Sequence, residues 1–251
     1  MTLRNPDREA VAHGHITNEP IRQKPGVPSW VLKLIMAVTG LLFALFVVGH
    51  MAGNLKLYLP AHGGEEALDQ YGAFLRSMGE PLFPHEGALW IIRAVLLVAI
   101  IAHIYGAIAL TARSKASRGK FKRTNLMGGL DSFATKSMLV TGVVLLLFII
   151  FHLLDLTLGV QPVAPEAFVE GSVKANMIET FSRWPVTIFY VLAMCCLFLH
   201  LTHGIRLAAS DLGITGAKWR QTFLVLAYII PAVVCIGNIV MPLSVALGLV
   251  S

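Results

Sequence analysis

Five long apolar segments follow one another along the chain, separated by shorter polar connections. They cover about residues 30–55, 89–112, 137–158, 184–208 and 223–249. A helix needs roughly 20 apolar residues to cross the hydrocarbon core of a bilayer, and each segment reaches that length. The apolar residues run continuously and do not alternate with polar ones, which disfavours a membrane β-barrel. The pattern therefore predicts an all-α integral membrane protein with a bundle of five transmembrane helices.

The connections between these segments predict further features. Residues 1–28 are polar and contain four prolines, so we expect an N-terminal tail before a membrane domain of residues 29–251. No short apolar stretch ahead of a small-residue cleavage site marks a signal peptide. In the longest connection, 56–88, the segment EEALDQYGAFLRSMG predicts a short amphipathic helix. The segments show no obvious internal repeat.

Composition and charge agree with a membrane protein and indicate its orientation. Only 14% of the residues are charged, whereas a soluble domain carries about a quarter. Lys and Arg concentrate in the tail and in the 113–136 and 206–220 connections. Cytoplasmic loops are enriched in these residues, so we expect a cytoplasmic N-terminus and an external C-terminus. The net charge of +6 then reflects membrane insertion, and no nucleic-acid partner is implied. Such a face can also bind a soluble protein or anionic membrane lipid.

Five of the nine histidines lie inside the predicted spans. At about 1.5 Å of rise per residue, His50 and His152 fall in the outer halves of their helices, and His103 and His200 in the inner halves. The two levels should be roughly 10–15 Å apart on the same arithmetic. Ionisable residues inside a bilayer are rare and usually functional. Two imidazoles at one depth on different helices suit a haem with one histidine on each side of the iron.

Small residues near these histidines support the same interpretation. Gly49, Gly53, Gly106 and Gly204 could leave room for a porphyrin, although small residues also serve the ordinary close packing of membrane helices. Zinc or copper would need three or four ligands that converge at one level, and the histidines come in pairs.

Two other chemistries remain as alternatives. A histidine–cysteine iron–sulfur cluster needs two thiolates on one iron, but Cys195 and Cys196 point about 100° apart on a helix and Cys235 lies in another span. We expect these cysteines to be buried small residues. A transporter could line its pathway with the intramembrane histidines, but the spans hold few other polar residues and no matching breaks.

Several stretches resemble the membrane cytochrome b subunits of succinate dehydrogenases and fumarate reductases, in particular the single-chain, five-helix, two-haem type. The stretches are HMAGNLK (50–56), YGAFLRSMGEPLFP with LWIIR (71–84 and 89–93), FHLLDLT (151–157) and HLTHGIRLAASDLG (200–213). The resemblance covers nearly the whole chain after the tail. It implies that His103 and His200 hold a haem b on the cytoplasmic side, and that His50 and His152 hold a second one on the external side.

The last of these stretches contains two histidines, and the resemblance distinguishes them. Such subunits typically read His-x-x-x-Gly-Ile-Arg-x-x-x-x-Asp here, which makes His200 the ligand and leaves His203 one turn nearer the cytoplasm. His203 could contact a haem propionate or simply pack. Arg206 on the inner side and Arg93 on the outer side could bind propionates because a guanidinium matches a carboxylate. Both arginines could instead be anchors at helix ends. Asp155, one turn after His152, could join a network around that ligand.

The resemblance implies a role in succinate:quinone oxidoreductase, respiratory complex II, in the bacterial cytoplasmic membrane. A flavoprotein subunit with FAD would oxidise succinate, and an iron–sulfur subunit would pass the electrons to this chain. The chain itself would reduce a quinone, with menaquinone favoured by the likeness, and would carry no succinate-oxidising site. Ser29 and Trp30, where the chain enters the membrane, are candidates for an inner quinone site. Tyr71, Arg76 and Glu80 in the external connection could serve an outer one, although most of these residues could instead serve loop packing. The reverse enzyme, quinol:fumarate reductase, and a cytochrome b anchor of another dehydrogenase remain alternatives, and the oligomeric state stays open.

Overall fold

The computed structural model describes residues 26–118 and 130–250, and for residues 118 and 130–136 it describes the helix but not the side chains. Nearly all of the tail predicted for residues 1–28 therefore lies outside the described residues, as do residues 119–129 of the basic 113–136 connection. Every regular element in the described ranges is a helix or a helical turn. The division into tail and membrane domain stays a prediction.

Five long helices form the body of the protein, and each is long and apolar enough to cross a membrane. They are α2 (Ser29–Asn54), extended by the 3₁₀ turn η1 (Leu55–Tyr58); α4 (Gly87–Arg118); α5 (Leu130–His152), extended by the π-helical turn η2 (Leu153–Thr157); α7 (Trp184–Asp211); and α8 (Ala217–Ala246). The prediction of five spans is confirmed. The helices differ from it mainly at their ends: α8 begins six residues before the predicted start, because polar residues continue the helix beyond the apolar stretch.

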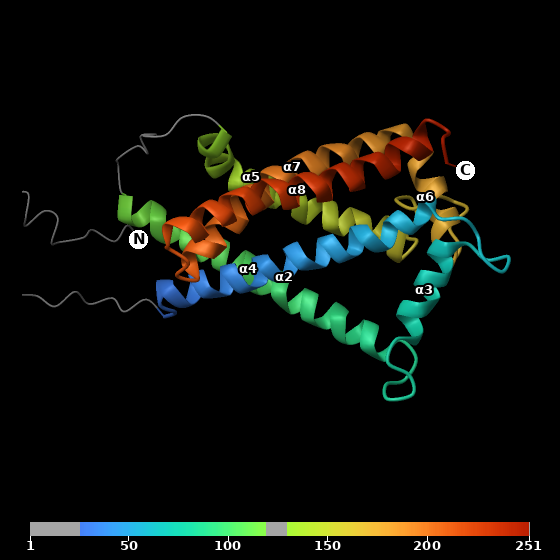
Figure 1. The fold of residues 1–251 in the computed structure, drawn as a ribbon, viewed down its shortest axis with the longest axis horizontal. Helices are drawn as coiled ribbons and strands as arrows, with labels where there is room; N and C mark the ends of the chain where they lie inside the picture. Colours follow the sequence, from blue (N-terminus) through green and yellow to red (C-terminus); the bar gives the residue numbers. More distant parts are fainter. Residues whose placement is uncertain (1–25, 119–129, 251) are drawn as a thin grey trace, which may run out of the picture.

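The five helices run roughly along the long axis of the molecule (Figure 1). Helices α2, α5 and α8 begin at one end, and α3 and α6 lie at the other end, near the C-terminus. Helix α7 packs against α8, α5 and α2, whereas α4 packs mainly along α2. Towards its first residue α4 diverges from α2, and α3 connects the ends of the two helices (Figure 1). Helix α7 is therefore the common neighbour around which the bundle is built.

Large apolar side chains cover much of the outside of the bundle. Examples on four different helices are Leu45, Val98, Leu147 and Ile236, each about 60% exposed or more. A soluble monomer rarely leaves so much contiguous apolar surface in water, whereas lipid tails are as apolar as these side chains. The chain is a multi-pass membrane protein.

Two short helices cover the end of the bundle that lies opposite the start of α2. Helix α3 (Ala67–Ser77) is the amphipathic helix predicted in the 56–88 connection. Helix α6 (Val173–Phe181) was not predicted, because half of its buried side chains, Asn176 and Thr180, are polar. The carboxylate of Asp69 on α3 accepts a 2.8 Å hydrogen bond from the backbone N–H of Lys174, which joins the two helices.

The contact between α2 and α8 depends on a glycine. A Cβ atom on Gly237 would lie 2.5 Å from Sδ and 3.0 Å from Cγ of Met51, which is buried. We expect Gly237→Val to destabilise the fold by about 1–3 kcal/mol through overpacking, measured as a lower thermal unfolding midpoint in detergent. Ile236→Val, at a position exposed to lipid, is the control. Equal midpoints for the two variants would contradict this close packing.

Candidate functional site

Four of the five intramembrane histidines meet in two pairs. His103 on α4 faces His200 on α7, with ring centres 6.3 Å apart and ring planes at 55°. We call these the proximal pair, because they lie nearer the end at which α2 begins. His50 on α2 faces His152 at the end of α5, with ring centres 5.8 Å apart and planes at 86°. We call these the distal pair. The structure thus brings together the same partners that helix depth suggested.

The spacing within each pair suits a metal between the two rings. Two metal–imidazole bonds of about 2 Å, plus about 1.1 Å from each nitrogen to its ring centre, place the ring centres about 6 Å apart. The observed 6.3 Å and 5.8 Å agree with that separation. In the described residues no three His, Cys, Asp or Glu side chains gather as metal ligands. The arrangement therefore fits a planar group held by two axial ligands.

Threonine hydroxyls orient both rings of the proximal pair. Oγ1 of Thr39 lies 2.9 Å from Nδ1 of His103, and it donates its own proton to the carbonyl of Ile35. Because that proton is committed, the oxygen accepts the Nδ1–H of the ring. A metal-bound histidine generally donates its second ring N–H in this way. The lone pair on Nε2 of His103 is then free for a metal.

The partner ring is held in the same way from another helix. Oγ1 of Thr141 on α5 lies 3.2 Å from Nδ1 of His200, and it donates to the carbonyl of Ser137. Glycine follows threonine in both places. A Cβ on Gly40 would lie 3.5 Å from Cε1 of His103, and one on Gly142 would lie 3.6 Å from Cε1 of His200. These glycines keep open the ring edge beside Nε2.

The distal pair is held differently. Nδ1 of His152 lies 3.2 Å from the hydroxyl of Tyr190, which donates to Oδ2 of Asp155 at 3.0 Å. The tyrosine oxygen therefore accepts the Nδ1–H of His152, so Nε2 of this ring is also free. No side-chain hydrogen bond to His50 is found in the described part of the chain. Three of the four rings thus have the tautomer that a metal ligand needs, assigned from their hydrogen bonds.

The supporting residues belong to an internal repeat that the sequence analysis missed. MAVTGLLFALFVVGH (36–50) on α2 and MLVTGVVLLLFIIFH (138–152) on α5 share Met, Val, Thr, Gly, Leu, Phe and His at equivalent positions. In each copy the threonine supports a proximal histidine on the following long helix, and the final histidine belongs to the distal pair. The phenylalanine four residues earlier stacks on that histidine, with ring centres 5.4 Å apart for Phe46 and 5.7 Å apart for Phe148. A signal was present in the sequence, since both copies have nine residues between Gly and His.

The glycines singled out in the sequence divide into two groups. A Cβ on Gly49 or Gly204 would meet no atom within 4 Å, so these two positions leave open space beside ligand helices. Gly53 and Gly106 serve packing instead. The ring of Tyr71 lies against Gly53, and Met36 lies against Gly106, where a Cβ would come within 2.9 Å of its Sδ. The expectation of room for a porphyrin therefore does not hold at Gly53 and Gly106.

Asp155 joins a buried network, as the sequence analysis expected. Its side chain is fully buried, and its Oδ1 accepts hydrogen bonds from Arg183 at 2.7 Å and Thr180 at 3.2 Å. Arg183 also donates to the carbonyl of Val163 at 2.8 Å. A buried carboxylate is tolerated only when it is paired and hydrogen-bonded. Both oxygens of Asp155 meet that condition through residues that the sequence analysis did not select.

The structure places the remaining candidate residues as follows. Arg93 stacks over the ring of Trp90 at 4.7 Å and lies 3.7 Å from Glu86, so its guanidinium already has partners at the start of α4. His203 and Arg206 follow His200 on α7 and are half-buried. Their contact with a propionate stays a prediction.

The proposed entry site for quinone is less open than expected. The hydroxyl of Ser29 accepts a 3.0 Å hydrogen bond from Arg113, and Trp30 is 67% exposed. Neither residue lines the cavity between η1 and α3 or the cavity along the start of α8. The same arginine donates to the carbonyl of Val27 at 2.6 Å, so it fastens the end of α4 to the start of α2.

The cysteines differ from the expectation that all three are buried. Cys235 is buried and donates to the carbonyl of Met194 at 3.2 Å, but Cys195 is exposed and Cys196 is half-buried. Adjacent helical positions cannot both face the interior of the bundle. Cys195 therefore faces outward, towards lipid.

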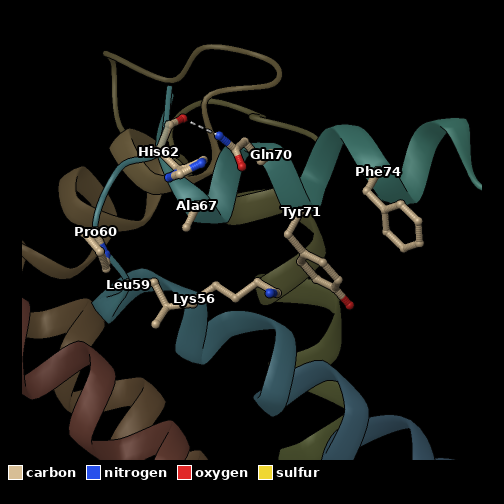
Figure 2. Close-up of a pocket in the computed structure, with 8 residues that line it drawn as sticks. All are labelled: Lys56, Leu59, Pro60, His62, Ala67, Gln70, Tyr71 and Phe74. Atoms are coloured by element: carbon tan, nitrogen blue, oxygen red, sulfur yellow. Dashed lines mark hydrogen bonds between the residues drawn. The ribbon is translucent and has the colours of Figure 1, made fainter. Parts of the chain in front are cut away.

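The larger cavity lies between η1 and α3, at the distal end of the bundle (Figure 2). It has a volume of about 640 Å³, and its walls include Lys56, Tyr71 and Phe74. The ammonium of Lys56 lies 5.6 Å from the centre of the Tyr71 ring. Because Tyr71 packs against Gly53, one turn after His50, the cavity is close to the distal pair. A second cavity of about 420 Å³ lies along the start of α8.

Fold and site together define a class: multi-pass membrane proteins that hold two pairs of imidazoles between their helices. A family model described as "Succinate dehydrogenase/Fumarate reductase transmembrane subunit" matches residues 117–237, which include His152, Tyr190 and His200. The match spans just under half of the chain and supports a succinate dehydrogenase or fumarate reductase membrane subunit. Such a family implies a membrane subunit of an oxidoreductase complex, with other subunits and a quinone as partners. No curated protein and no solved structure matches the chain.

The threonine supports can be tested directly. Thr39→Val keeps the shape of the side chain but leaves the Nδ1–H of His103 without an acceptor, which costs about 1–3 kcal/mol for a buried group. Loss of such a support typically weakens metal binding by about 10–100-fold. We expect a lower thermal midpoint and weaker retention of the cofactor.

Thr202→Val is the matched control. Thr202 is buried on α7 and donates to the carbonyl of Phe198 but supports no histidine. If both variants lost cofactor equally, the hydrogen bond from His103 to Thr39 would not be the cause.

Proposed function

We propose that this chain is the dihaem cytochrome b subunit of a bacterial succinate:quinone oxidoreductase, and that it connects an iron–sulfur subunit to a quinone in the cytoplasmic membrane. The observation that carries the proposal is the presence of two imidazole pairs with ring centres 6.3 Å and 5.8 Å apart. His103 and His200 would hold one haem b, and His50 and His152 the other. The description of the matched family indicates the enzyme complex to which such a subunit would belong.

Haem bound at these pairs supplies reversible one-electron chemistry. The chain's own residues do the rest. Thr39, Thr141 and Tyr190 orient three imidazoles, so that each presents Nε2 to the metal. The apolar helices exclude water, and the bundle fixes the distance between the two levels. His50 is eleven positions after Thr39, and His152 is eleven positions after Thr141. At about 1.5 Å per residue the two levels are then about 16 Å apart along the bundle, close to the separation expected from sequence.

The orientation of the path follows from charge. The end at which α2 begins would face the cytoplasm, because it carries most of the Lys and Arg of the chain. There Lys33 on α2 pairs with Asp211 at the end of α7 at 3.2 Å. The iron–sulfur subunit would dock at this end, near the proximal pair, with the FAD-containing flavoprotein beyond it. Much of the basic run at 113–123 lies outside the described residues.

The cavity beside η1 is the better candidate for the quinone. It is large enough for a ring head group, it adjoins the distal pair, and Lys56 and Tyr71 offer hydrogen-bond donors on apolar walls. Ser29 and Trp30 lack such a cavity. Electrons entering at the proximal pair would therefore leave at the distal end, with menaquinone as the favoured acceptor. The opposite direction, quinol:fumarate reduction, uses the same path. The family match favours neither a transporter nor an anchor of another dehydrogenase.

Ligand variants test the haem sites. The purified protein should contain two haems b for each chain, measured from the pyridine haemochrome spectrum. His200→Ala should remove one haem and His50→Ala the other, because each iron loses an axial ligand. His203→Ala is the control and should keep both.

Two results would contradict this assignment of ligands. One is a protein without haem. The other is a His203→Ala variant that loses a haem while His200→Ala keeps two.

The quinone site is tested by Lys56→Met, which removes a donor but keeps an apolar stem. We expect the KM for a soluble menaquinone analogue to rise several-fold, while succinate oxidation by an artificial acceptor of the soluble subunits stays the same. Lys218→Met, in the smaller cavity on α8, is the control. A rise in KM for Ser29→Ala and not for Lys56→Met would place the quinone at the opposite end.

A further inference from the structure

The two histidine pairs differ in whether the hydrogen-bond chain that begins at Nδ1 ends on a neutral group or on a carboxylate. In the proximal pair, each Nδ1–H donates a hydrogen bond to a threonine hydroxyl. Each hydroxyl in turn donates a hydrogen bond to a neutral backbone carbonyl. In the distal pair, the Nδ1–H of His152 ends on Tyr190, and Tyr190 donates in turn to the carboxylate of Asp155. Only the distal pair is therefore linked to a formal negative charge.

That carboxylate is held rigidly and is paired with a guanidinium. Asp155 is fully buried, and its pairing with Arg183 at 2.7 Å favours the ionised state. Its two oxygens have separate tasks: Oδ1 accepts from Arg183 and Thr180, and Oδ2 accepts only from Tyr190. The bond to Tyr190 is thus available to polarise the tyrosine hydroxyl.

We propose that Asp155, acting through Tyr190, lowers the midpoint potential of the distal haem below that of the proximal haem. The inference rests on the proposed function. A tyrosine that donates to a carboxylate is a stronger acceptor at its oxygen, because hydrogen bonds in a chain polarise one another. The stronger hydrogen bond polarises the Nδ1–H bond of His152 and makes its Nε2 a better electron donor to iron. A better donor stabilises the ferric form, which lowers the potential.

The charge of Arg183 does not cancel this effect. The guanidinium lies one link farther from His152 than the carboxylate does, and its side chain is 30% exposed. Solvent therefore screens it more than it screens the fully buried carboxylate. Asp155 and Tyr190 are positioning residues in this account, since they touch neither iron nor quinone.

The consequence is a difference between two sites that the internal repeat would otherwise make alike. The copies on α2 and α5 supply equivalent Thr, Phe and His residues, but the described residues contain only one link from a distal histidine to a carboxylate. The chain itself would then set the order of the two potentials along the path.

The test is a redox titration of the assembled complex, followed in the haem absorption bands. The unsubstituted complex should show two components. Asp155→Asn removes the negative charge with little change in shape, and Tyr190→Phe breaks the link but leaves the pair of Asp155 and Arg183. Both variants should raise the lower potential and leave the higher one unchanged. Asp155→Asn should keep two haems, and Tyr190→Phe, which also removes the acceptor of the Nδ1–H of His152, should hold the distal haem more weakly.

Thr187→Val is the control, because Thr187 is buried on α7 near Tyr190 but donates only to the carbonyl of Phe181. It should leave both potentials unchanged.

The possible failures of the two proposals are distinguishable. If the unsubstituted complex contains no haem, the proposed function is wrong. If it contains two haems whose potentials do not respond to Asp155→Asn and Tyr190→Phe, only the present inference is overturned. It is also overturned if Asp155→Asn loses one haem, because the carboxylate then builds the site and does not tune it.

Discussion

Four imidazoles inside an apolar bundle impose the constraint on which the rest of this structure depends. Each neutral ring brings one N–H group and one lone pair to a place where water is scarce, and each group must find a partner there. In three of the rings the N–H is taken up by a hydroxyl whose own proton is already donated elsewhere. In those three rings Nε2 keeps its lone pair. The proposed bis-histidine sites thus depend on how the N–H groups are satisfied.

This constraint explains why the bundle has its particular neighbours. Helix α7 carries His200 and Tyr190, so it must contact α5, which supplies Thr141 and His152. Helix α4 carries His103, so it must pack along α2, which supplies Thr39. Each copy of the repeat on α2 and α5 therefore contributes to both histidine pairs. Its threonine accepts a hydrogen bond from a proximal histidine on another helix, and its own histidine belongs to the distal pair. The exposed apolar side chains of the outer faces then need only to match lipid.

Much of this arrangement could be predicted from sequence, and the part that could not has a physical reason. The five spans follow from length and hydropathy, and the pairing of His50 with His152 and of His103 with His200 agrees with the depth estimated from helical rise. Depth does not give the rotation of one helix relative to another. For that reason the sequence analysis did not find that Thr39, Thr141 and Tyr190 are the supports, or that Cys195 faces outward. It named Ser29 and Trp30 at one end and Tyr71, Arg76 and Glu80 at the other as quinone candidates, and only Tyr71 among them lines the cavity between η1 and α3, because a cavity is not visible in sequence. Helix α6 was missed because polar side chains make up half of its buried face.

The match to the succinate dehydrogenase/fumarate reductase family gives this geometry its setting, and in the proposed function the two histidine pairs form a path across the bilayer. The central claim is that each histidine pair binds one iron as two axial ligands. Electron paramagnetic resonance of the oxidised protein at low temperature tests it most directly, because two strong imidazole ligands make ferric haem low-spin. The account predicts two low-spin ferric signals of equal intensity, one lost in His200→Ala and the other in His50→Ala. A high-spin signal in the unsubstituted protein, or no haem signal, would contradict it.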